Sequence, residues 1–158
     1  MSADAPGAGD ASPVQTAGGL LIDAAGRILL GLRAHHKRVA AGYWDIIGGH
    51  LKFGESAAEA LVREIHEELG VTPTCYRLIA SVCEPPSLAG ESGCVHHVFL
   101  ITEWTGGIPR NACEEHARIG WFRPSEIREL ANKTPFDFDG LLERAGVLAA
   151  TGGLPPSR

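Results

Sequence analysis

The stretch Gly49–Val71, GHLKFGESAAEALVREIHEELGV, is the part of the chain that decides the fold. Ser56 and Glu59 have the spacing of a helix capping box, in which each side chain satisfies a free amide at the helix start. Gly70 suits the left-handed position just after a helix end. Apolar residues recur between them at helical spacing, at Leu61, Val62, Ile65 and Leu69. The stretch therefore predicts an amphipathic helix.

Three carboxylates crowd another side of this predicted helix. Glu64, Glu67 and Glu68 stand at positions i, i+3 and i+4, where each like-charge pair costs about 0.2–0.5 kcal/mol. They also lie near the helix C-terminus, where the macrodipole disfavours negative charge. Local rules broken at one place are typical of a functional site, and clustered carboxylate oxygens suit Mg²⁺ or Mn²⁺. A solvated acidic face is the alternative interpretation of the three residues alone.

The residues before the helix favour a functional interpretation. Gly48, Gly49 and Gly54 flank a short segment that is followed by Glu55, and a glycine-rich turn lets backbone approach a ligand closely. Taken whole, the stretch resembles the signature of the Nudix (MutT-like) hydrolase family, G-x5-E-x7-R-E-U-x-E-E-x-G-U, in which U is a bulky apolar residue. All defined positions match, at Gly49, Glu55, Arg63, Glu64, Ile65, Glu67, Glu68, Gly70 and Val71.

The resemblance implies a metal-dependent hydrolase that cleaves a nucleoside diphosphate linked to another group, by attack of water on phosphorus. The metal, Mg²⁺ or Mn²⁺, would be bound by the carboxylates of Glu64, Glu67 and Glu68 and by the backbone carbonyl of Gly48. Glu64 or a neighbour such as Glu67 would orient or deprotonate the water. Arg63 would pair with one of these carboxylates and fix its rotamer, and Glu55 would support the loop and the helix start.

A second acidic pair lies well beyond the predicted helix. Many family members recruit a further carboxylate from a loop in this part of the chain, and Glu114 and Glu115 lie in such a loop. The resemblance favours Glu115, six residues before Trp121, as a metal ligand or catalytic base. A surface acidic pair is the alternative interpretation.

Candidate substrate-binding residues come from the basic segment around residues 33–42 and from the start of the signature. Arg33 and Arg38 are candidates for phosphate binding, with solvated surface charge as the alternative. His50 is a candidate for a hydrogen bond to phosphate or base, or for a structural role. Many relatives have proline directly before the two glycines, where this chain has Ile47. That departure removes no catalytic atom, because the expected ligand there is a carbonyl.

Specificity in this family lies outside the signature. We expect the substrate to be a nucleoside triphosphate or an oxidised purine nucleotide, cleaved to monophosphate and pyrophosphate. ADP-ribose or a sugar nucleotide is the alternative. Isopentenyl diphosphate isomerases share the fold and a similar Trp-Asp…Gly-Gly-His segment. They use a cysteine upstream of the signature, however, and this chain has none before Cys75. A non-catalytic Nudix-like binding domain is a further alternative, although such domains typically lose glutamates that are present here.

Composition limits the remaining function classes. At 158 residues with a formal net charge of −5, the chain predicts one domain and argues against nucleic-acid binding, which needs a basic face. The four cysteines show no C-x-x-C spacing, so we expect free thiols rather than a zinc site. The first residues lack the features of a signal peptide, and no run is long enough to span a membrane. We expect a cytoplasmic protein whose partner is a small nucleotide-type substrate; relatives are often homodimers.

The order of predicted elements indicates an α/β domain with a mixed sheet. The family resemblance would make it the Nudix α/β/α sandwich. We expect a flexible tail over residues 1–14, the Nudix domain over 15–150, and a second tail over 151–158. Strands are expected over 14–22 and 27–33 as a β-hairpin, then over 44–47, 75–83, 95–104 and 119–122, with later helices over about 123–130 and 135–149.

Overall fold

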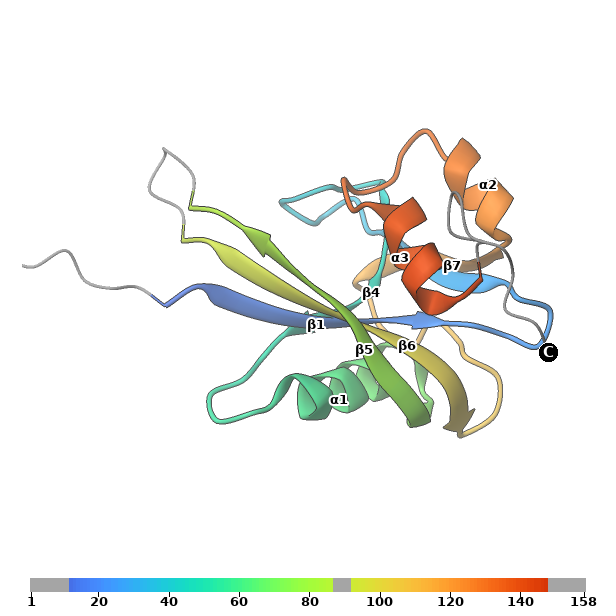
Figure 1. The fold of residues 1–158 in the computed structure, drawn as a ribbon, viewed down its shortest axis with the longest axis horizontal. Coiled ribbons are helices and arrows are strands. Elements are labelled where there is room, and N and C mark those ends of the chain that lie inside the picture. The colour runs from blue at the N-terminus through green and yellow to red at the C-terminus, as the bar shows by residue number, and fades with distance from the viewer. Residues whose placement is uncertain (1–11, 87–91, 148–158) are drawn as a thin grey trace, which may run out of the picture.

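The computed structural model describes residues 12–86 and 92–147, which form two β-sheets with helices on both sides (Figure 1). The elements in chain order are β1 (Val14–Leu21), β2 (Ile28–Arg33), β3 (Trp44–Asp45), β4 (Ile47–His50), α1 (Ala57–Leu69), β5 (Thr72–Glu84), β6 (Cys94–Thr105), β7 (His116–Phe122), α2 (Pro124–Glu129) and α3 (Phe138–Ala145). Residues 1–11 of the predicted first tail, the predicted second tail and residues 87–91 lie outside the described residues.

The larger sheet is mixed, as the α/β prediction requires. Its strand order is β4-β1-β6-β5; β1 and β6 are parallel, whereas β4 and β5 pair antiparallel with their neighbours. The predicted strand over residues 95–104 corresponds to β6, which lies between β1 and β5. Its residues Val98, Phe99, Leu100 and Ile101 are all buried, as expected for an apolar strand covered on both faces.

The predicted hairpin over residues 14–33 is wrong. The turn does form, and Ile22 pairs with Ile28 in an isolated bridge, but β1 and β2 then enter different sheets. The smaller sheet has the order β3-β2-β7. Ile28, Leu29 and Leu30 are all fully buried, and Leu29 enters one core while its two neighbours enter the other. Because β2 is apolar on both faces, it lies between the two cores rather than at the edge of the larger sheet.

Helix α1 has the predicted ends. The Ser56 hydroxyl accepts a hydrogen bond from the Glu59 amide (3.1 Å), and the Glu59 carboxylate accepts one from the Ser56 amide (2.9 Å). Gly70 ends the helix in the left-handed conformation, with φ of 70°. Of the apolar stripe, Leu61, Ile65 and Leu69 are fully buried against β1 and β4, whereas Val62 is half-buried.

Gly48 and Gly49 lie within strand β4 rather than in a turn, where they pair with Gly18 and Ala17 of β1. A methyl group added at Gly48 would collide with the Ala17 carbonyl. The glycine therefore allows two strand backbones to approach each other, whereas the sequence predicted a turn whose backbone approaches a ligand.

The other two helices lie on the opposite side of the larger sheet from α1 (Figure 1). Helix α3 packs on β5 and α2 packs on β7. Proline opens α2 as predicted, and α3 begins at Phe138, later than expected, with Asp137 as its N-cap. No helix among the described residues is both long and apolar enough to cross a membrane.

Candidate active site

Arg63, in the middle of α1, is the centre of a charged network that links the helix to the loop before it. Its guanidinium binds both oxygens of Glu55, at 2.7 and 2.9 Å, and donates to the His50 carbonyl at 3.0 Å. The same side chain binds Glu64 at 2.7 Å and reaches Glu67 at 3.4 Å. A bidentate guanidinium–carboxylate pair fixes both partners in direction as well as in distance. Arg63 thus ties the loop after β4 to the carboxylates of the helix.

The network keeps Glu55 ionised. The hydrogen bonds from Arg63, and then the one from the Lys52 backbone amide (2.8 Å), lower the pKa of Glu55 to about 2. The same contacts raise the pKa of Arg63 above its ordinary value. Glu55 therefore carries a fixed negative charge that is already neutralised by Arg63, which is what a supporting role requires.

Gly49 allows the Glu64 carboxylate to lie against β4. A methyl group at Gly49 would be 2.6 Å from Cδ of Glu64. Any larger residue would push this carboxylate away from the strand. Gly48, whose carbonyl the sequence predicted as a metal ligand, directly precedes Gly49. The Glu64 carboxylate therefore lies against the backbone segment that contains this carbonyl.

Glu68 differs from the other carboxylates of α1 because it is buried. It is 2% exposed, and neither of its oxygens has a hydrogen-bond partner. Burial raises its pKa to about 7, and the nearby Glu115 and Glu64 act in the same direction, against the opposite influence of His116. A buried carboxylate without partners is costly unless a cation or proton neutralises it.

Glu115 is brought to Glu68 by the loop before β7. Burial alone would raise its pKa, but the contacts with Glu68 and with Lys37, whose Nζ lies 3.2 Å away, lower it overall. The two neighbouring carboxyls therefore have pKa values shifted in opposite directions. At neutral pH Glu115 is ionised while Glu68 holds a proton part of the time.

The family model described as NUDIX domain matches residues 13–142. The chain belongs to the Nudix family. Escherichia coli (strain K12) CTP pyrophosphohydrolase is 32% identical over 107 residues, which cover 67% of this chain and 73% of that relative. An isopentenyl-diphosphate Delta-isomerase of Leifsonia xyli is 31% identical over 141 residues, covering 85% and 76%. The crystal structure of a MutT NUDIX hydrolase from Burkholderia pseudomallei has a TM-score of 0.70 at 29% identity, covering 84% and 97%.

Family and relatives together identify this chain as a Nudix hydrolase, an enzyme that acts on phosphorus-containing acid anhydrides. Nudix hydrolases generally use a divalent metal, and the residues present fit one. Two buried oxygens of Glu68 have no partner, and Glu115 adds an ionised carboxylate beside them. Oxygen donors of this kind suit a hard divalent cation.

The structure brings some predicted residues together and separates others. The Nε of Arg33 donates to the Val39 carbonyl at 2.9 Å, and its Nη1 lies 3.4 Å from Asp45, so Arg33 is engaged by its own loop. Arg38 is exposed on that loop, and His50 is exposed at the end of β4. Glu64 and Glu67 are both held by Arg63.

Sequence reasoning missed two residues beside Glu68. Among the described residues, Glu68, Cys113 and His116 offer potential metal-binding atoms that all lie within 4.8 Å of one another. A signal for the burial of Glu68 did exist. It stands seven residues after Leu61 and three after Ile65, so it belongs to the apolar stripe as well as to the acidic group. No comparable signal placed Cys113 or His116 there, because the loop that carries them is distant in sequence.

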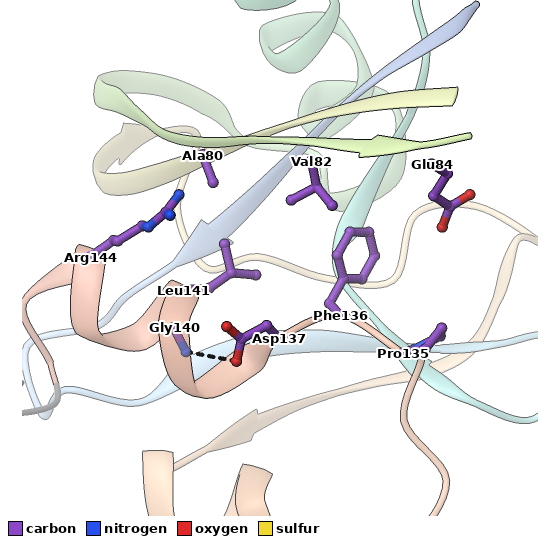
Figure 2. Close-up of a pocket in the computed structure, with 9 residues that line it drawn as sticks. All are labelled: Ala80, Val82, Glu84, Pro135, Phe136, Asp137, Gly140, Leu141 and Arg144. Atoms are coloured by element: carbon purple, nitrogen blue, oxygen red, sulfur yellow. Dashed lines mark hydrogen bonds between the residues drawn. The ribbon is translucent and has the colours of Figure 1, made fainter. Parts of the chain in front are cut away.

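This Nudix enzyme also has a cavity of about 310 Å³ between β5 and α3 (Figure 2). Figure 2 shows Phe136, Val82 and Leu141 pointing toward one another across it, with Glu84 at one end and Arg144 at the other. The residues that line it are Ala80, Val82, Glu84, Pro135, Phe136, Asp137, Gly140, Leu141 and Arg144. A mostly apolar hollow with a few charged groups is typical of a small-molecule site.

His96 lies beside this cavity and contacts both a residue that lines it and a residue of strand β1. Its ring packs edge-on against Phe136 with centroids 5.3 Å apart. Its Nδ1 lies 2.7 Å from the Thr16 hydroxyl, and its Nε2 lies 3.3 Å from a Glu84 oxygen. The histidine pair at residues 96–97, to which the sequence assigned no role, is thus divided between the two faces of the sheet, because the side chains of a strand alternate.

Proposed function

We propose that this Nudix hydrolase cleaves nucleoside triphosphates, including oxidised purine nucleotides, to a nucleoside monophosphate and pyrophosphate with Mg²⁺ or Mn²⁺. The observation that carries the proposal is the juxtaposition of two carboxyls, the buried Glu68 and the ionised Glu115, beside the carboxylates that Arg63 holds. Relatives support the substrate class: besides the Escherichia coli CTP pyrophosphohydrolase, they include an 8-oxo-dGTP diphosphatase of Proteus vulgaris that is 27% identical over 95 residues.

The metal would be held by the carboxylates of Glu64, Glu67, Glu68 and Glu115 and by the Gly48 carbonyl. A bound divalent ion neutralises charge on phosphate oxygens and lowers the pKa of water, which is the chemistry that phosphoanhydride hydrolysis needs. Glu68 supports this assignment best, because its two oxygens are buried without a partner.

The chain's own residues would position and deprotonate the water. Arg63 holds Glu64 at 2.7 Å and so limits its rotamers, which favours Glu64 as the group that orients the water. Glu115 is ionised at neutral pH, because the pKa of its carboxyl is lowered rather than raised. It lies beside Glu68, and the lowered pKa makes it a weaker proton acceptor than an ordinary glutamate. Both are general-base candidates, since a base must be ionised and placed before reaction.

The nucleoside would occupy the cavity beside Phe136, with its phosphates directed across the sheet toward the Nudix signature. His50, Thr16, His96 and Val82 stand opposite one another in four adjacent strands. Their side chains therefore share one face and form a row from the signature to the cavity. Neighbouring strands are about 4.8 Å apart, so the row is roughly 14 Å long. Base, sugar and phosphates would lie in sequence along it.

Two basic residues are the candidates for phosphate contacts. His50 is exposed at the end of β4, at the signature end of the row, and Arg38 is exposed in the loop between β2 and β3. Arg33 would act differently: its contacts with Val39 and Asp45 shape the loop that carries Arg38.

A hydrolysis screen tests the proposal. The purified protein is incubated with Mg²⁺ or Mn²⁺ and a panel of nucleoside triphosphates, oxidised purine triphosphates, ADP-ribose, sugar nucleotides and coenzyme A, and products are separated by chromatography. We expect monophosphate and pyrophosphate from one or more triphosphates. Release of inorganic phosphate alone, or preferential cleavage of ADP-ribose, would reject the triphosphate assignment while keeping the family.

The isomerase activity is the second candidate, favoured by the Leifsonia xyli relative that matches 85% of this chain. Against it, the chain has no cysteine before Cys75, and Cys75 itself is exposed on β5. Incubation with isopentenyl diphosphate, followed by analysis for its double-bond isomer, decides between the two activities.

A further inference from the structure

A largely buried group of unlike donor atoms adjoins the carboxylates of the signature. It consists of Glu68 near the end of α1, the half-buried Cys113 in the loop between β6 and β7, and His116 at the start of β7. The three offer a carboxylate oxygen, a thiol sulfur and an imidazole nitrogen, and these atoms lie within 4.8 Å of one another. The proposed function uses only Glu68 of the three.

The carboxylate and imidazole atoms of this group lack hydrogen-bond partners. Both oxygens of Glu68 and both nitrogens of His116 are buried with no hydrogen-bond partner, and the two side chains are 3% and 5% exposed. Their closest approach, from Glu68 Oε1 to His116 Nε2, is 3.6 Å, which is longer than a hydrogen bond. Four buried polar atoms without a hydrogen bond in one place are costly. The 3.6 Å ion-pair contact between Glu68 and His116 offsets this cost only in part, so the arrangement favours a ligand between them.

The backbone holds the imidazole in this place. A methyl group at Gly31 of β2 would lie 2.5 Å from His116 Nδ1, so the ring rests directly on that strand. β2 and β7 are paired there, with a register irregularity between Leu32 and Arg33. Burial raises the pKa of the Cys113 thiol overall, and the neighbouring backbone amides of Glu115 and His116 act against that rise. Amide donors of this kind stabilise a metal-bound thiolate.

We propose that Glu68, Cys113 and His116 form a second metal position that takes a borderline transition-metal ion such as Zn²⁺ or Co²⁺ rather than Mg²⁺. Thiolate and imidazole ligands select such ions, whereas Mg²⁺ requires oxygen ligands. Three protein ligands leave a fourth coordination position open. The inference rests on the proposed function in one respect only, the sharing of Glu68 between this position and the Mg²⁺ site.

The sharing of Glu68 has a consequence for regulation of the enzyme. An ion bound to Cys113 and His116 would draw the Glu68 carboxylate toward them and away from the catalytic metal. Zn²⁺ should therefore inhibit hydrolysis supported by Mg²⁺, and added Mg²⁺ should relieve that inhibition only weakly, because it cannot replace Zn²⁺ at sulfur.

Cobalt provides a direct test, because a Co²⁺–thiolate bond gives a charge-transfer absorption in the near ultraviolet. We expect this band when the reduced, metal-free full-length protein is titrated with Co²⁺. The band should disappear in Cys113→Ser and remain in the control Cys75→Ser, whose thiol is exposed on β5. One equivalent of Zn²⁺ should bleach the band, and a large excess of Mg²⁺ should not.

A measurement on the unmodified chain covers the case in which Cys113→Ser does not fold. Zn²⁺ should protect Cys113 from alkylation, as mapped by mass spectrometry, while the exposed Cys75 and Cys83 stay reactive. Absence of the band, its persistence in Cys113→Ser, or alkylation of Cys113 at the same rate with Zn²⁺ would overturn the inference. Hydrolysis with Mg²⁺ is measured separately: activity without a cobalt band rejects only this metal position, whereas a band without hydrolysis rejects only the proposed function.

Discussion

Glu68 is the residue at which charge and burial conflict most strongly. It occupies a position of the apolar stripe of α1, yet it is a carboxylate with neither oxygen paired. A residue selected for stability alone would be apolar at this position. The conflict is resolved if the carboxylate binds a cation. Substitution of Glu68 should therefore lower activity without lowering stability.

We expect Glu68→Gln to lower hydrolysis by roughly a hundredfold or more, the size typical of losing one group that stabilises charge in a transition state. The fold should be retained, because glutamine has almost the same volume and no charge to bury. Steady-state kinetics and thermal denaturation measure the two effects. Glu114→Gln, at an exposed neighbour of Glu115, is the matched control and should keep wild-type rates; full activity in Glu68→Gln would remove Glu68 from the metal site.

The raised pKa of Glu68 also predicts a pH dependence of stability in the metal-free protein. The folded state retains the proton up to a pKa of about 7, whereas the unfolded chain releases it near 4.5. The folded state therefore binds more protons between these values, and stability falls as pH rises. One unit corresponds to about 1.4 kcal/mol, so the loss is about 3 kcal/mol.

Denaturant unfolding of the wild type and of Glu68→Gln, both with chelator, tests this pH dependence. The difference between their free energies of unfolding should shift by that amount from pH 4.5 to 7.5, in favour of the variant at high pH. A difference that stays constant with pH would show that the carboxyl titrates normally. The lowered pKa of Glu55, about 2, affects stability only at more acidic pH and does not interfere.

The sequence predicted those residues of the candidate site that contact one another within a single helix. Arg63 and the glutamates of α1 follow from fixed spacing on one helix, and their mutual contacts have the geometry that this spacing allows. Cys113 and His116 were missed because their approach to Glu68 depends on where the loop before β7 meets the end of α1. That approach is set by the pairing of β7 with β2, which no local pattern in the sequence specifies.

The same distinction holds for whole elements. Helix α1 was predicted with both ends, because the capping box and Gly70 act within a few residues of each end. The hairpin over residues 14–33 was wrong, because the turn specifies only a reversal of direction. Which strands then pair is decided by burial: β2 is apolar on both faces and lies between two cores. Strand register and sheet membership are properties of the packed molecule.

The two glycines of β4 have different roles, which substitution by alanine should distinguish. Gly48→Ala should destabilise the protein by about 1–3 kcal/mol, the usual cost of overpacking, because the new methyl group meets the Ala17 backbone. Gly49→Ala meets only the end of the Glu64 side chain, which can move. It should therefore fold normally and lose activity. Equal losses of stability in the two variants, measured by denaturant unfolding, would contradict this division.

The charged network around Arg63 predicts that lysine cannot replace arginine at this position. Arg63→Lys keeps the positive charge but loses the bidentate contact with Glu55 and cannot reach the His50 carbonyl at the same time. We expect a lower melting temperature and a lower kcat, because the loop and Glu64 are both released. Lys52→Arg changes an exposed cation nearby and serves as the control. Wild-type kcat in Arg63→Lys would show that charge alone suffices.

At the scale of the whole molecule, the larger sheet separates two tasks. One face of this sheet packs on α1, which carries the carboxylates, and α3 lies on the other side (Figure 1). The cavity lies on the α3 side. The row from His50 to Val82 lies on that side as well, and it runs from β4, at the start of the signature, to the cavity. If substrate lies along this row, chemistry and recognition are located at opposite ends, and substitutions at the two ends should affect different kinetic constants.

Phe136 provides the test at the recognition end. Phe136→Ala should raise KM for the nucleotide by about tenfold, since a stacked base contributes roughly 1–3 kcal/mol, and should leave kcat nearly unchanged. The control Leu78→Ala removes an apolar side chain that is 51% exposed on β5 and should change neither constant. The two variants are first compared by thermal denaturation, because Phe136 is half-buried. A folded Phe136→Ala enzyme with unchanged KM would place the base elsewhere, whereas a fall in kcat alone would assign Phe136 to positioning of the reacting phosphate.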